Sequence, residues 1–108
     1  MDNRSSPRRP ISVEVVYQSG SKFITSYLYN ISRSGAFIQT PDPFDPGTQI
    51  DISFHIPGLG DSFNIVVTVT WNQGPERSFR PGMGVRFDKM SSEDRRRLDD
   101  FLEMFENT

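Results

Sequence analysis

Apolar and polar residues alternate along most of the chain, which is the pattern of β-strands that place one face on a core. The first such stretch contains Ile11, Val13, Val15 and Tyr17 on one parity, with Val16 as an exception on the other. Further apolar stretches follow at 22–30, 36–38, 50–56, 63–71 and 83–87. Six short strands are therefore predicted.

Turn-forming residues separate these stretches. A Gly- and Ser-containing hairpin is predicted at 18–21, and a polar Asn/Ser/Gly segment interrupts the apolar pattern at 30–35. A Pro-rich loop at 41–47, a Pro/Gly turn at 57–61 and a polar loop at 72–81 complete the connections. Short connections of this kind are typical of antiparallel neighbours.

The period of the apolar residues changes near the C-terminus. Ser91 offers a hydroxyl N-cap, with Glu93 and Asp94 in the first helical turn. Apolar side chains then recur at helical spacing, at Leu98, Phe101, Leu102 and Phe105. This predicts an amphipathic helix over 91–106 whose apolar stripe covers an open end or edge of the sheet. The fold class is therefore all-β, a six-stranded antiparallel β-barrel with one C-terminal helix, because closure removes exposed strand edges.

Composition narrows the possible functions. The 108 residues make one small domain, in which Val and Ile outnumber Leu and Ala by 15 to 5, as strands favour. The chain has no Cys and one His, His55, which is expected to face solvent; no disulfide, thiol nucleophile, zinc site or other catalytic centre is expected. No apolar run approaches the roughly 18 residues of a membrane span, and no signal peptide pattern is present. We expect a cytoplasmic protein without membrane insertion, cofactor or metal.

The net charge of −2 conceals a basic N-terminus. Within the first nine residues, Arg4, Arg8 and Arg9 are opposed only by Asp2. Residues 1–10 contain almost no apolar side chain, which predicts a flexible arm preceding a folded domain over 11–108. Guanidinium groups bind phosphate bidentately and stack on nucleobases, so the arm could wrap a compact anionic ligand; a solvated tail is the other interpretation.

Two other features are candidates for binding. Asn30, Ser32 and Gly35 lie at the connection between the second and third strands. Asn and Ser can hydrogen-bond a base edge or phosphate, and Gly admits a ligand or another backbone, although the same residues suit an ordinary turn. Trp71 shares parity with Val69, so it is expected to pack in the core or at the barrel rim, with ligand stacking as the alternative.

The combined spacing Arg4-x-x-x-Arg8 and Asn30-x-Ser32-x-x-Gly35 resembles the signature of PilZ domains, RxxxR followed by D/N-x-S-x-x-G. Further family landmarks at 46–48, 69–71 and 81–87 extend the resemblance over nearly the whole chain. The resemblance implies a PilZ-type barrel and a bacterial receptor for the second messenger cyclic di-GMP. Carried over to this sequence, it implies a set of ligand-binding residues, namely Arg4, Arg8, Asn30, Ser32 and Gly35, with Arg9 beside them.

The resemblance also implies a mechanism and an alternative. Asn3 stands where many binders carry a further arginine, and one missing charge-assisted bond costs about tenfold in affinity. A ligand that bridges arm and barrel would order the arm and signal to a downstream protein partner, with no DNA or RNA polymer involved. The alternative is an adaptor that binds no nucleotide and docks onto a motility, pilus or signalling protein through the terminal helix or the loop around Phe44.

Overall fold

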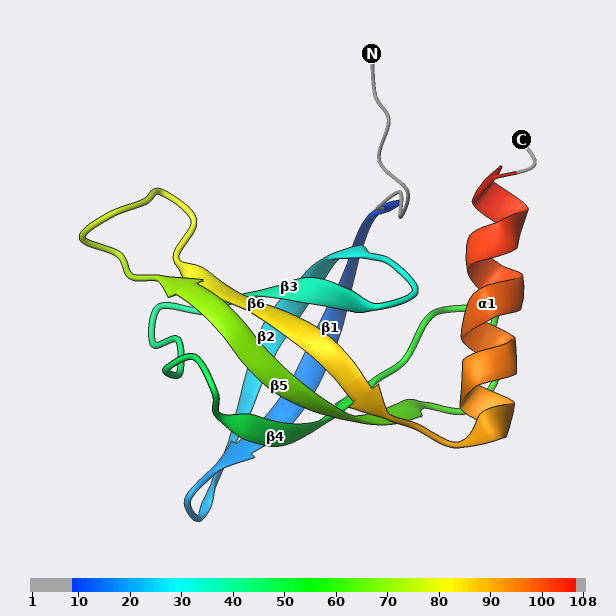
Figure 1. Ribbon diagram of the computed structural model, residues 1–108, viewed down its shortest axis with the longest axis horizontal. Helices are drawn as coiled ribbons and strands as arrows, with labels where there is room; N and C mark the ends of the chain where they lie inside the picture. The colour runs from blue at the N-terminus through cyan, green and yellow to red at the C-terminus, as the bar shows by residue number, and fades with distance from the viewer. Residues whose placement is uncertain (1–8, 107–108) are drawn as a thin grey trace.

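Six strands and one helix make up the part of the chain that the computed structural model describes, residues 9–106. They are β1 (Arg9–Ser19), β2 (Lys22–Ile31), β3 (Gly35–Gln39), β4 (Gln49–Phe54), β5 (Phe63–Gln73), β6 (Gly82–Lys89) and α1 (Ser92–Glu106). The strands pair antiparallel and close into a barrel in the order β1-β2-β3-β6-β5-β4 (Figure 1). The predicted six-stranded antiparallel barrel with a C-terminal helix is confirmed.

The first strand begins at Arg9, two residues before the alternating pattern that predicts it. Arg9 pairs with Ile31 of β2, and the register shifts between Arg9 and Ser12. A proline is tolerated at such an irregularity because its missing N–H is not needed for the ladder, which accounts for Pro10 within the strand. The predicted arm therefore overlaps β1 by its last two residues, and its other residues, 1–8, lie outside the described part of the chain.

Side chains from alternate strand positions fill the interior of the barrel. Val13, Val15 and Tyr17 of β1 are buried as the alternation predicts, and the exception, Val16, lies on the outer face. Of the three buried side chains, only Tyr17 has a polar group, and its hydroxyl forms a hydrogen bond with the Ser26 hydroxyl, with 3.1 Å between the oxygens. The interior beside this row is therefore apolar, and the two hydroxyl groups buried there, those of Tyr17 and Ser26, satisfy each other.

Different elements cover the two ends of the barrel. Figure 1 shows α1 beside the β2–β3 turn and the β4–β5 loop, and its Leu98, Phe101 and Leu102 belong to the core cluster as predicted. Away from the helix, Phe44 of the β3–β4 loop packs edge-on against Tyr17, with ring centroids 5.8 Å apart. Phe44 is therefore tied to the core, while Asp45 and Pro46 beside it in the loop are exposed.

The guanidinium of Arg97 ties α1 to the β4–β5 loop. It donates hydrogen bonds to the carbonyl oxygens of Leu59 and Asp61 and forms a 2.9 Å ion pair with Asp94. It also lies 4.2 Å from the centroid of the Phe63 ring. The helix is thus held to the barrel by polar contacts as well as by its apolar stripe. Within residues 9–106, no helix has the length and apolar character needed to cross a membrane.

Candidate functional site

The turn from β2 to β3 begins at Asn30, whose backbone is left-handed with φ of 54°. Asparagine tolerates this conformation better than most side chains, which gives a backbone reason for an Asn at this position. The Asn30 side chain is exposed, on the outside of the barrel. The first residue of the second motif therefore presents its amide to the surface.

Ser32 has a different position, because its side chain is only 1% exposed. Its Oγ accepts hydrogen bonds from the backbone N–H groups of Ser34 and Gly35, at 3.3 and 3.2 Å. The hydroxyl also lies 3.2 Å from the carbonyl oxygen of Gly35, to which it can donate. Because the hydroxyl is buried and its hydrogen bonds are made within the turn, we assign Ser32 to shaping the turn.

Gly35 is required by the close approach of two strands. A Cβ atom on Gly35 would lie 2.2 Å from the carbonyl oxygen of Val85 in β6, a contact with backbone that cannot swing away. Of the two uses that the sequence suggests for this glycine, ligand approach and backbone approach, the structure shows the second. Gly35 therefore fixes where the turn sits against β6.

The residue that follows the first motif, Arg9, lies beside this turn. Arg9 pairs with Ile31, the residue between Asn30 and Ser32 in the second motif. Arg4 and Arg8 lie outside the described residues, but Arg8 is bonded directly to Arg9. The register of β1 and β2 therefore brings Arg9, the residue that follows the first motif, next to the second motif, although the two are distant in the sequence.

Trp71 lies on the outside of the barrel, so the expectation of core packing is wrong. The register of β5 against β6 shifts between Val69, which pairs with Val85, and Trp71, which pairs with Gly84. The extra residue of such a bulge reverses the alternation of inward and outward side chains. Val69 is consequently buried, while Trp71 is 46% exposed.

Trp71 stacks on Phe37 of β3, with ring centroids 5.5 Å apart and the planes inclined by 25°. Glycines of β6 make room for both rings on the outer face. A Cβ on Gly84 would lie 2.0 Å from Nε1 of Trp71, and a Cβ on Gly82 would lie 2.4 Å from Cζ of Phe37. We call this pair of rings, Phe37 and Trp71, the aromatic shelf.

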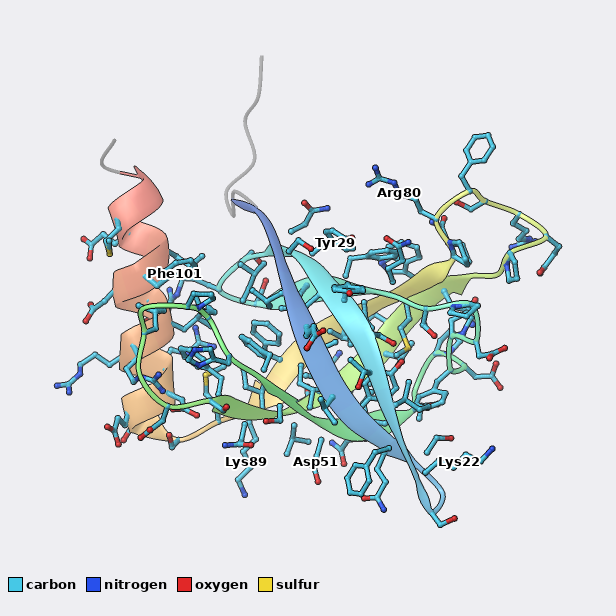
Figure 2. All side chains as sticks on the ribbon, turned by 180° about the vertical axis from the view of Figure 1, so that it is seen from behind. Lys22, Tyr29, Asp51, Arg80, Lys89 and Phe101 are labelled. Carbon is cyan, nitrogen blue, oxygen red and sulfur yellow. The ribbon has the colours of Figure 1, made fainter. Side chains whose placement is uncertain are left out.

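The aromatic shelf borders a groove of about 430 Å³ on the outer surface of the barrel. The groove is lined by Tyr29, Asn30, Ala36, Phe37, Trp71, Gln73, Arg80 and Gly84. In Figure 2, the Arg80 side chain extends from the β5–β6 loop toward the side of the molecule where Tyr29 lies. An aromatic face flanked by amide and guanidinium donors can hold a purine base by stacking and by hydrogen bonds to its edge.

Sequence reasoning missed Phe37, Gln73 and Arg80 as members of this groove. Phe37 lies in a short apolar run, which predicts a position in the core. Arg80 lies in a polar loop, and no local pattern there indicates a binding residue. The available signal was Gly82-Met83-Gly84, because glycines two apart on one strand face mark a place where other side chains cross closely. Only the strand pairing shows which rings cross there.

Ion pairs connect the surroundings of the site. Arg33, in the turn of the second motif, pairs with Asp99 of α1 at 3.0 Å, so the turn and the helix are linked. On the outer face of β5 and β6, a hydrogen bond from Thr68 and an ion pair with Arg86 hold the pKa of Asp88 below its ordinary value of 3.8. Asp88 does not line the groove, so its charge belongs to the strand surface and not to the candidate site.

Comparisons with known proteins agree with this geometry. The family model of the PilZ domain matches residues 2–104. A similar solved structure is that of the Bacillus subtilis inhibitor of motility, MotI/DgrA, with a TM-score of 0.80 and 18% sequence identity over 100% of this chain. The chain spans about half, 53%, of that protein. No curated protein matches the chain significantly. The chain thus belongs to the PilZ domain family, whose members are regulatory receptor or adaptor domains and not enzymes.

Proposed function

We propose that this chain is a receptor for cyclic di-GMP, in which Arg4 and Arg8 of the arm and the turn at Asn30 hold the dinucleotide between them. The observation that supports this most is the pairing of Arg9 with Ile31, because Arg9 directly follows the first motif in the chain and Ile31 belongs to the second. The groove beside Asn30 adds an aromatic face of the size a purine needs. A ligand with two phosphates and two guanines matches both halves of such a site.

Each residue of the proposed site has a separate role. Arg4 and Arg8 supply guanidinium groups for the phosphates and for a guanine, with Arg9 beside them. Asn30 presents its exposed amide to a guanine edge. Ser32 and Gly35 act indirectly, since the first shapes the turn and the second sets its distance from β6. A base can stack on the aromatic shelf, which is the alternative that the sequence left open for Trp71.

The site also suggests how binding is transmitted. A ligand that touches both arm and barrel favours the state in which the arm lies against the turn, and it drives the change by its higher affinity for that state. The turn is joined to α1 through Arg33 and Asp99, so the helix is the element through which a protein partner could sense the ligand. We propose a downstream protein partner in the cytoplasm for this readout.

Calorimetric titration with cyclic di-GMP tests the proposal. Wild type should bind, and Arg8→Ala should show no measurable binding with an almost unchanged melting temperature, because Arg8 precedes the first strand. Arg96→Ala removes the same charge from an exposed position of α1 and should bind like wild type. Affinity should fall as salt is added, because phosphate contacts are screened. Equal affinity of Arg8→Ala and wild type would contradict the assignment.

A second candidate, a protein-interaction adaptor, is favoured by one surface. The outer face of β1 and β2 exposes Phe23 (75%), Tyr27 (48%) and Val16 (37%), and exposed aromatic side chains are common at protein interfaces. The similar structure MotI/DgrA is that of an inhibitor of motility. Chemical shifts at Arg8 and Asn30 that move on adding cyclic di-GMP support the receptor, whereas no change at millimolar ligand supports the adaptor.

A further inference from the structure

Arg80 is the charged group of the groove. Of the described residues that line it, Arg80 alone carries a charge, and the others are aromatic, small or amide side chains. Within residues 9–106, Arg80 forms no ion pair, in contrast to Arg33, Arg86, Arg95 and Arg97. A guanidinium beside an aromatic face, without a carboxylate to neutralise it, is available to a ligand.

The backbone holds Arg80 in place beside the groove. The side-chain amide of Gln73 donates to the carbonyl oxygen of Arg80 at 2.7 Å, and the N–H of Arg80 donates to Oγ of Ser78 at 2.9 Å. The next residue, Pro81, accepts a 3.0 Å hydrogen bond from the N–H of Thr40. The base of the loop is therefore fixed to the end of β5 and to the residue that follows β3, and the Arg80 side chain starts from a defined position. The atoms that Arg80 and Pro81 contribute to these contacts are main-chain atoms, so truncating the Arg80 side chain leaves the contacts intact.

The chemistry of the groove distinguishes guanine from other bases. Guanine presents two acceptors, O6 and N7, on one edge, and a guanidinium donates to both at once. Adenine presents a donor at the position of O6, which repels a guanidinium. We propose that Arg80 is a specificity-determining residue that donates hydrogen bonds to the O6 and N7 edge of a guanine stacked on the aromatic shelf. This inference rests on the proposed receptor function and adds to it a residue outside both motifs.

The assignment also accounts for the departure in the first motif. The position before Arg4 is Asn3, so the arm offers one guanidinium fewer than the arms of many binders. Arg80 approaches the groove from the β5–β6 loop (Figure 2) and brings an arginine from another part of the chain. Because hydrogen bonds to Gln73 and Thr40 hold the base of the loop before a ligand arrives, little ordering of its backbone is required on binding.

A thermodynamic cycle tests the proposal by combining the substitution of Arg80 in the protein with the removal of atom N7 from the ligand. The ligands are cyclic di-GMP and its 7-deaza analogue, in which each N7 is replaced by CH. The proteins are wild type, Arg80→Ala and the matched control Arg77→Ala, which removes the same charge from the same loop without lining the groove. Binding is measured by calorimetry and by the fluorescence of Trp71, the one tryptophan of the chain, which lies in the groove.

We expect Arg80→Ala to weaken binding of cyclic di-GMP by about 10- to 100-fold, and Arg77→Ala to leave it nearly unchanged. Wild type should bind the 7-deaza analogue roughly tenfold more weakly than cyclic di-GMP. For Arg80→Ala, the difference in affinity between the two ligands should be much smaller. If Arg80→Ala lowers the affinity for cyclic di-GMP and for its 7-deaza analogue by the same factor, the contact is to phosphate and the proposal is overturned. Unchanged binding in Arg80→Ala overturns it as well. Failure of wild type to bind cyclic di-GMP would instead remove the receptor function on which it rests.

Discussion

Replacing Gly84 with alanine tests whether the aromatic shelf depends on the glycines of β6. In an ordinary strand this change stabilises slightly, by about 0.5–1 kcal/mol, because glycine loses more backbone freedom on folding. Here the added Cβ would lie 2.0 Å from Nε1 of Trp71 and 2.6 Å from Cδ1 and Cε2. These distances are far below van der Waals contact, so the indole has to leave its position.

The cost follows from what the indole loses when it moves. Trp71 is 46% exposed, so a little over half of its surface is covered by the barrel and by Phe37. Losing roughly 100 Å² of apolar contact at about 25 cal/mol per Å² costs ~2.5 kcal/mol, and the broken ring pair adds ~1 kcal/mol. The gain from replacing glycine offsets ~0.5–1 kcal/mol of this. We therefore expect G84A to lower the free energy of unfolding by about 2.5–3 kcal/mol.

The same substitution in a W71A background isolates the indole as the cause. Removing the indole removes the three atoms closest to the added Cβ, so G84A should then be neutral or stabilising by ~0.5 kcal/mol. Urea unfolding followed by far-UV circular dichroism measures all four proteins, because W71A lacks the tryptophan needed for fluorescence. If G84A costs the same in both backgrounds, to within about 0.5 kcal/mol, the reasoning is refuted.

Two further predictions concern charged groups. D88N should be less stable than wild type at neutral pH, because the ionised Asp88 carboxylate, whose pKa is lowered in the folded protein, stabilises the fold. The difference in stability should shrink as the pH falls below 3.8 and the carboxylate becomes protonated. A difference that stays constant down to about pH 2 would contradict this. R97M should lower the free energy of unfolding by about 2–3 kcal/mol, because the carbonyl groups of Leu59 and Asp61 lose their hydrogen-bond donor. The control R96M, at an exposed position of the same helix, should change it by less than ~0.5 kcal/mol. Equal effects of the two variants in urea unfolding would argue against this role of Arg97.

The regular elements were predictable because their signals are local. Alternation assigns Val13, Val15 and Tyr17 to the interior, and it places His55 on the exposed parity, as the structure confirms. Helical spacing likewise identifies Leu98 and Phe101 as the apolar stripe of α1. In each case the residues that define the pattern are near neighbours in the chain, so backbone geometry alone decides which face they share.

Prediction failed where the sheet departs from regular geometry. Trp71 has the parity of Val69, but the bulge between them turns it outward. The start of β1 was placed too late because Pro10 and the charged residues around it give no alternating signal, and the strand is set by pairing with β2. Ser32 could be recognised as part of a motif, but whether its hydroxyl faced solvent or the turn depended on hydrogen bonds formed after folding.

The sequence by itself determined the fold class, the order of strands and helix, and the two motifs that mark the PilZ family, because these depend on periodicity and on residue spacing. Only the tertiary structure decided that Arg9 lies beside Ile31, that Phe37 and Trp71 form a shelf over glycines, and that Arg80 reaches the same groove. These contacts join residues from different strands, and their positions follow from register and bulges. Register is set by the packing of the whole barrel, which no local pattern in the chain encodes.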